Sequence, residues 1–290
     1  DLVDFSESVF NEIKADYVKF SENLDSAKFH FMPMSALTGD NVVNPSEQMP
    51  WYDGGALMPL LEIIEIADDK NYSAFRFPVQ YVNRPNLNFR GFCGTVASGV
   101  IRKGDEVIVL PSNKTSRIKS IVTYDEELEL AHAEMAVTLT LEDEIDVSRG
   151  DILAHPENIP ASDSKFDATI VWMAETPLLP GNTFDFKLGS KMVSGRLNTI
   201  HNRIDVNTLE KVPAPGLELN EIGLAEINLD ETVCFDNYKD NRATGSFIII
   251  DRLSNVTVGA GMIDCEQQPR RERSESKNII VTKEERAARY

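Results

Sequence analysis

The stretch Met34–Gly55, MSALTGDNVVNPSEQMPWYDGG, decides how the first part of the chain folds. It follows the apolar run Phe29–Pro33, whose large side chains and following turn residues predict a buried strand. Ser35, Ala36 and Leu37 would therefore lie at the carboxyl end of that strand. In open α/β sheets this edge carries the ligand, because the strand ends and the loops after them leave a crevice.

Helices are predicted on both sides of this stretch. Before it, apolar side chains recur at steps of four and three over residues 5–24, which predicts one amphipathic helix. Asp4 and Glu7, three positions apart, have the pattern of a capping box at its start. After it, the apolar segment Leu57–Ile66 predicts a second helix.

From Phe75 onward the apolar period changes to two, which is typical of strands. Phe75, Phe77, Val79 and Tyr81 alternate as one face of a predicted strand. Through residues 88–153, glycines divide β-prone segments at short intervals, as the tight corners of a small antiparallel barrel require.

A second series of strands follows a polar, proline-containing boundary at residues 157–164. No helical period interrupts it, which predicts another antiparallel barrel. The expected strands cover residues 168–173, 183–188, 191–204, 221–229, 245–251 and 256–263.

Composition limits the classes of function. The 290 residues carry a formal net charge of −18, which argues against a nucleic-acid partner because phosphate contacts rely on clustered Lys and Arg. No apolar run approaches the ~20 residues of a membrane span and no signal peptide opens the chain, so we expect a cytoplasmic protein. Cys93, Cys234 and Cys265 lack CxxC spacing and the four histidines are scattered, so no metal site is predicted.

Residues 34–55 resemble the last guanine-recognition loop of translation-factor-type GTPases and the segment that closes their nucleotide domain. The resemblance implies that Ser35, Ala36 and Leu37 bind the guanine of GTP, where small side chains let backbone amides approach the exocyclic oxygen. Asp1 falls where the family's Asn-Lys-x-Asp motif ends, and its carboxylate would accept hydrogen bonds from two guanine nitrogens.

The phosphate-binding motif GxxxxGK[ST] does not occur in this sequence. The residues that contact phosphates and Mg²⁺ are therefore expected to precede Asp1. Consequently we name no catalytic residue and no metal ligand, and we expect this chain alone to be inactive as a GTPase.

The two predicted barrels are similar to the second and third domains of elongation factor Tu and its relatives. The likeness narrows to the large, GTP-binding subunit of bacterial ATP sulfurylase (sulfate adenylyltransferase subunit 1) and runs over almost all of residues 1–263. Its most specific segments are NVVNPSEQMPWYDGG, FPVQYVNRPNLNFRGFCGTVASGVIRKGDEVIVLPS and DNRATGSFIIIDRLSNVTVGAGMI.

This resemblance implies a mainly β fold of two consecutive antiparallel barrels, over residues 73–158 and 160–263. Residues 1–70 before them would be the C-terminal remnant of an α/β P-loop GTPase domain that carries the guanine-recognition loop. Residues 264–290 would be a linker, which also resembles the lead-in to the adenylylsulfate kinase domain fused to some family members. We expect that the chain is cut at both ends.

In function, the resemblance implies a regulatory GTPase that assembles with a smaller catalytic subunit. That partner adenylylates sulfate with ATP, and GTP hydrolysis drives formation of adenosine 5′-phosphosulfate. GTP is the expected nucleotide, with Mg²⁺ held in the full-length protein by ligands outside this chain. The alternative is a translation elongation factor that delivers aminoacyl-tRNA, which fits the same fold and guanine loop but not the acidic charge.

Overall fold

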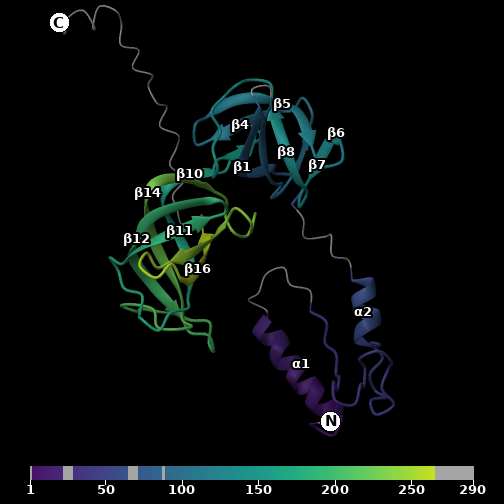
Figure 1. Cartoon of the computed structure of the whole chain (residues 1–290). Coiled ribbons are helices and arrows are strands. Elements are labelled where there is room, and N and C mark those ends of the chain that lie inside the picture. The colour runs from purple at the N-terminus through teal and green to yellow at the C-terminus, as the bar shows by residue number, and fades with distance from the viewer. Residues whose placement is uncertain (1, 22–28, 65–70, 87–88, 265–290) are drawn as a thin grey trace, which may run out of the picture. The chain divides into compact units, whose positions relative to one another are not determined.

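The computed structural model describes residues 2–21, 29–64, 71–86 and 89–264 (Figure 1). The chain divides into two compact units, residues 1–69 and 70–290. The expected guanine ligand Asp1 and the expected linker after Asp264 lie outside the described residues.

The described part of the first unit contains two helices, α1 (Glu7–Ser21) and α2 (Leu57–Ile63). Both expected helices are therefore present, although α1 begins later than its apolar pattern. The predicted Asp4–Glu7 capping box is wrong, because Asp4 has a left-handed φ of 51° and lies outside the helix. Instead the Ser6 hydroxyl accepts a hydrogen bond from the Val9 N–H at 3.5 Å.

The predicted strand over Phe29–Pro33 is also wrong. The segment has no regular secondary structure and is only partly buried. A strand needs a neighbouring strand for its backbone groups, and within residues 2–21 and 29–64 no such strand is present. The segment packs by aromatic contacts instead, with the Tyr17 ring centroid 5.4 Å from Phe29 and 5.7 Å from Phe31.

The first barrel occupies residues 76–154 and closes through six antiparallel strands in the order β4-β9-β1-β2-β8-β5, with β5 pairing back to β4. Phe77, Val107 and Leu139 are fully buried in its core. The short strands β3 (Val100–Arg102) and β7 (Leu130–His132) pair with each other, and β6 (Glu127–Leu128) pairs with β5. The six barrel strands are β1 (Arg76–Asn86), β2 (Phe89–Thr95), β4 (Glu106–Leu110), β5 (Lys114–Val122), β8 (Ala136–Leu141) and β9 (Ile152–Ala154).

The second barrel occupies residues 161–264 and closes in the same manner, in the order β11-β15-β16-β10-β14-β12 with β12 pairing back to β11 (Figure 1). Phe166, Phe186 and Ile227 lie in its core. The two-residue strand β13 (Lys211–Val212) flanks β12. The six barrel strands are β10 (Ala161–Trp172), β11 (Thr183–Leu188), β12 (Lys191–Ile204), β14 (Ile222–Phe235), β15 (Ser246–Ile250) and β16 (Thr257–Asp264).

The predicted mainly β fold with two antiparallel barrels is confirmed. Two details differ from the sequence pattern. Tyr81 is 61% exposed although Phe75, Phe77 and Val79 are buried, because the pairing of β1 with β2 shifts register between Val79 and Tyr81, and after this shift Val82 packs against the core instead. The expected boundary at 157–164 overlaps the start of β10 at Ala161, whose polar first residues pair with β14. The domain bounds and the GTPase-domain remnant stay predictions.

Candidate functional site

The loop after Pro33 is closed on itself by backbone hydrogen bonds around Ser35. The Ser35 N–H donates to the Asp40 carbonyl at 3.1 Å, and the Gly39 N–H donates to the Ser35 carbonyl at 2.9 Å. The Ser35 side chain is buried and accepts a hydrogen bond from the Thr38 N–H at 3.3 Å. Ser35 therefore holds the loop in shape and presents the two residues after it.

Two polar residues brace this loop from behind. Asn41 is 2% exposed; its amide donates to the Pro33 carbonyl at 2.8 Å and accepts from the Ser46 N–H at 2.7 Å. The carboxylate of Asp40 accepts hydrogen bonds from the Ser46 and Thr38 hydroxyls, which lower its pKa. The turn residues Asp40 and Asn41 therefore support the loop through side-chain hydrogen bonds.

Ala36 and Leu37 lie at the exposed tip, where the Leu37 side chain is 87% exposed. Within the described residues, their backbone N–H groups donate no hydrogen bond. Two N–H donors without an acceptor in the described residues, beside a small side chain, suit a ligand that presents a carbonyl oxygen. Of the four predicted guanine contacts, the structure brings together Ser35, Ala36 and Leu37, whereas Asp1 falls outside its described part.

In the second unit, the two barrels meet through a buried ion pair that the sequence pattern did not reveal. Arg76 of β1 and Asp236, just after β14, form a two-pronged pair, with Nε 2.8 Å from Oδ2 and Nη2 2.9 Å from Oδ1. The only signal in the sequence is an arginine between Phe75 and Phe77, at the start of a strand.

Further hydrogen bonds join the same two barrels. The Asn241 amide, before β15, donates to the Ser98 hydroxyl at 2.8 Å, and both side chains are buried. The Ser190 hydroxyl donates to the Val79 carbonyl at 2.7 Å. These two contacts join residues 143 and 111 positions apart in sequence, so no local pattern predicts them.

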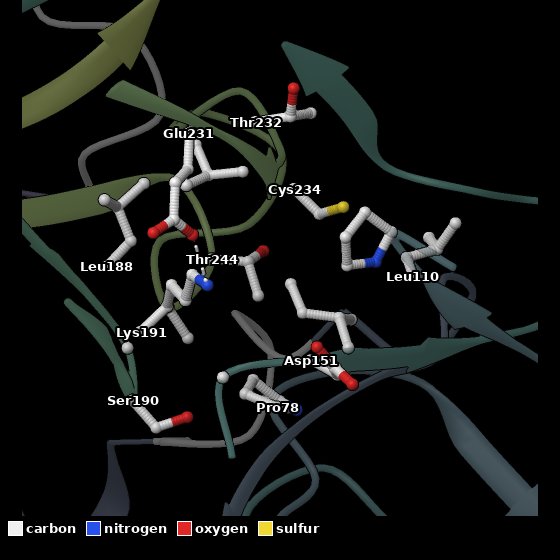
Figure 2. Close-up of a pocket in the computed structure, with 16 residues that line it drawn as sticks. Pro78, Leu110, Asp151, Leu188, Ser190, Lys191, Glu231, Thr232, Cys234 and Thr244 are labelled. Carbon is white, nitrogen blue, oxygen red and sulfur yellow. Dashed lines mark hydrogen bonds and ion pairs between the residues drawn. The ribbon is translucent and has the colours of Figure 1, made fainter. Parts of the chain in front are cut away.

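Beside these contacts, residues from both barrels enclose a cavity of about 370 Å³ (Figure 2). Asp151 reaches it from the first barrel, and Lys191, Glu231 and Cys234 from the second. Burial raises the pKa of the Asp151 carboxyl, outweighing the hydrogen bond from Ser148 and the charge of Lys191. Burial likewise raises the pKa of the Cys234 thiol, which keeps it protonated at neutral pH.

Metal and membrane sites are not found in the part of the chain that the structure describes. Over those residues, no group of three or more His, Cys, Asp or Glu side chains comes together. Cys93 and Cys234 are free and partly buried, and Cys265 lies outside the described ranges. Neither described helix has the length and apolarity that a bilayer crossing demands.

Each of the two barrels matches a known protein family. Residues 93–154 match elongation factor Tu domain 2, and residues 165–264 match the GTP-eEF1A C-terminal domain-like family. Each match lies within one of the two closed barrels.

Curated relatives that align with 90% or more of this chain indicate a more specific family than the two barrel matches do. Sulfate adenylyltransferase subunit 1 of Teredinibacter turnerae is 56% identical over 262 residues, covering 90% of this chain and 56% of the relative. The same subunit of Chromobacterium violaceum is 56% identical over 269 residues, covering 92% of this chain and 56% of the relative. The bifunctional enzyme CysN/CysC of Rhodopirellula baltica is 50% identical over 301 residues, covering 100% of this chain and 46% of the relative. The chain thus spans about half the length of the curated relatives it matches.

Solved structures share the fold at lower identity. Sup35 complexed with GMPPNP aligns with a TM-score of 0.62 at 23% identity, over 90% of this chain and 65% of that one. Elongation factor SelB from Methanococcus maripaludis, in the apo form, aligns with a TM-score of 0.57 at 22% identity, over 73% of this chain and 46% of that one. At these identities the likeness shows the fold alone.

Proposed function

We propose that this chain belongs to the family of sulfate adenylyltransferase subunit 1 and is part of the regulatory GTPase subunit of ATP sulfurylase. In this role the whole protein couples GTP hydrolysis to formation of adenosine 5′-phosphosulfate from ATP and sulfate. The observation that carries the proposal is the 56% identity over 90% of the chain, which includes both barrels and the Ser35 loop.

The Ser35 loop supports guanine binding. The exposed N–H groups of Ala36 and Leu37 are donors of the kind that the guanine exocyclic oxygen accepts, and the methyl side chain of Ala36 leaves room for the base. The buried Ser35 and Asn41 hold those donors in place from below. Asp1 would contribute the carboxylate that accepts from the guanine ring.

Adenylylation of sulfate itself is assigned to a separate catalytic subunit. The chain's two barrels, joined by a buried ion pair and direct hydrogen bonds, make a firm scaffold on which such a partner can assemble. The net charge of −18 supports a protein partner over a nucleic acid. Delivery of aminoacyl-tRNA by an elongation factor is the less supported function, since relatives at 54% and 56% identity are sulfate adenylyltransferase subunits.

A coupled enzyme assay tests the proposal. The full-length protein that contains this chain, mixed with a catalytic sulfurylase subunit, should stimulate sulfate-dependent release of pyrophosphate when GTP is present. ATP alone, or GTP without the full-length protein, should give much less pyrophosphate. A lack of GTP stimulation would overturn the assignment, and tight tRNA binding at physiological salt would then favour the elongation-factor function.

A variant pair tests the guanine loop within the same assay. Ala36→Trp places a bulky ring beside the two amide donors and should raise the GTP concentration for half-maximal stimulation by about ten-fold or more, the worth of one or two hydrogen bonds. Val43→Trp, at a 60% exposed position of the same loop region, is the matched control and should leave that concentration unchanged. If the two variants required the same GTP concentration for half-maximal stimulation, the loop would not be part of the guanine site.

A further inference from the structure

The cavity between the two barrels is assembled only when both barrels are in place. Its apolar lining comes from both of them: Pro78, Pro111 and Ile152 belong to the first barrel, and Leu188 and Val233 belong to the second. A volume of about 370 Å³ lies in the range of sites that hold small organic ligands.

The polar groups in the cavity are largely engaged with the protein. The Lys191 ammonium pairs with the Glu231 carboxylate at 2.9 Å, which neutralises both charges. The hydroxyls of Ser190 and Thr244 donate to the Val79 carbonyl and to Asp236. These groups therefore keep little capacity to bind a ligand.

Asp151 is the exception among the charged side chains that line the cavity. Its Oδ2 atom accepts from the Ser148 N–H at 2.8 Å, and within the described residues its Oδ1 atom has no hydrogen-bond partner. Figure 2 shows Asp151 apart from the Lys191–Glu231 pair, with no dashed line to either residue. Because Lys191 pairs with Glu231, Asp151 is the carboxylate in this lining that has no ion pair within the described residues.

The position of Asp151 is fixed by its neighbours. Its backbone carbonyl accepts from the Val79 N–H at 2.9 Å, and Gly150 before it has a left-handed φ of 95°. A Cβ atom on Gly150 would lie 2.9 Å from the Lys191 side chain, so this turn approaches the second barrel closely. Burial also raises the pKa of the Asp151 carboxyl, which a positively charged ligand would reverse.

We propose that this cavity is a binding site for a small organic cation, whose ammonium group pairs with Asp151 Oδ1 and whose apolar body lies against Pro78, Ile152 and Val233. Such a ligand bridges the two barrels and stabilises their junction. The site is separate from the guanine loop and independent of the proposed GTPase function, since it uses residues of the second unit alone.

Binding of phenethylammonium to the full 290-residue chain, followed by ligand-observed NMR, tests the proposal. We expect a dissociation constant on the order of 1 mM, as for a fragment of this size. The neutral phenethyl alcohol and the anionic 3-phenylpropionate, which have the same ring and a similar length, should bind at least about ten-fold more weakly, because only the ammonium forms a charge-assisted hydrogen bond.

Matched variants locate the site. Asp151→Asn keeps the shape of the side chain and its bond from Ser148, and it should weaken phenethylammonium binding by about ten-fold or more. Asp125→Asn removes the same charge from an exposed turn outside the cavity and should leave binding unchanged. Thermal unfolding of each variant checks that it remains folded.

Alkylation by iodoacetamide, read by peptide mass spectrometry, gives a second readout. Cys234 lines the cavity, so phenethylammonium should slow its alkylation, whereas alkylation of Cys93 on β2 should keep its rate. Preferred binding of the alcohol or the carboxylate, an unchanged affinity of Asp151→Asn, or absence of both binding and Cys234 protection would each overturn the proposal.

Discussion

Arg76 of the first barrel and Asp236 of the second are joined by two hydrogen bonds inside the protein, with their side chains 3% and 13% exposed. The remaining guanidinium donors go to the Phe75 carbonyl and to the backbone and side-chain oxygens of Asn158. All five N–H groups of Arg76 are thus used, which is the condition under which a buried arginine is tolerated.

Arg76→Ala should lower the free energy of unfolding by about 3–5 kcal/mol, because it leaves the Asp236 carboxylate buried without its cation. Arg76→Lys should rescue little of this loss, since an ammonium cannot reproduce the planar fork. Urea unfolding measures both. The exposed pair Lys103–Glu127 is the control, and Lys103→Ala should cost far less, because solvent screens an exposed ion pair. Equal losses at the two pairs would contradict this account of the junction.

Gly99→Ala and Gly104→Ala should differ, although both glycines have a left-handed φ, of 77° and 86°. A Cβ on Gly99 would lie 2.4 Å from backbone atoms of Phe75, whereas a Cβ on Gly104 would meet no atom within 4 Å. Gly104→Ala should therefore cost about 1 kcal/mol, from backbone strain alone. Gly99→Ala should cost at least about 2 kcal/mol more, because the backbone at Phe75, just before β1, must move. Thermal unfolding that shows the same loss for both variants would argue against this packing.

Asn41→Ala should loosen the loop that carries Ser35. The substitution removes the side-chain hydrogen bonds of Asn41 to Pro33, Met49 and Ser46, at a residue that is 2% exposed, and places alanine at a φ of 53°. We expect amide hydrogen exchange at Ser46, whose N–H donates to the Asn41 side chain, to accelerate by about ten-fold or more. Asn44→Ala, at an exposed position, should leave this exchange rate unchanged. Slow exchange at Ser46 in both variants would show that Asn41 does not brace the loop.

Asp151→Asn should stabilise the free protein at neutral pH. Burial raises the folded-state pKa of Asp151, so the folded protein favours the protonated acid. The stability from this group is fully present below the unfolded pKa of about 3.9 and is lost as the pH rises through the folded value. Asparagine does not ionise and avoids that loss, so the advantage of the variant should fade below about pH 4.

For Asp251, the expected pH dependence of stability is opposite in sign to that for Asp151. Hydrogen bonds from the backbone of Ser254 and Leu253 lower its pKa, so its contribution is present above the unfolded pKa of about 3.9 and is lost as the pH falls through the folded value. Asp251→Asn should therefore destabilise the protein at pH 7, and its deficit should shrink in acid. Urea unfolding between pH 3 and pH 7 compares the two variants; parallel pH profiles for both would contradict the assigned pKa directions.

The alternation of apolar residues determined the barrels from sequence. Phe75, Phe77 and Val79 are buried as the period of two predicts, and the strands at Thr183–Leu188 and Lys191–Ile204 have the predicted bounds. Strand sequences report burial directly, because successive side chains point to opposite faces. The resemblance of residues 34–55 to a guanine loop likewise rests on local sequence, and the structure places Ser35, Ala36 and Leu37 in one turn.

Phe29–Pro33 shows where local pattern failed. Its composition suits a strand, yet strand formation depends on a neighbour that supplies backbone partners, and the described part of the first unit contains none. The capping box failed for a similar reason, because Asp4 adopts a left-handed backbone and Ser6 takes its place. A short polar motif does not determine at which of several nearby residues the helix begins.

By itself, the sequence determined the β period of the barrels and the resemblance from which the family and the guanine-binding residues are predicted, since each depends on side chains that are close along the chain. Only the tertiary structure decided that Arg76 meets Asp236, that Asn241 meets Ser98, and that Asp151 shares a cavity with Cys234. These partners lie between 83 and 160 residues apart. Such pairs form only when the two closed barrels pack together. Burying a charge or a polar group is unfavourable unless a partner neutralises it or forms hydrogen bonds with it, so the packed barrels bring such partners together.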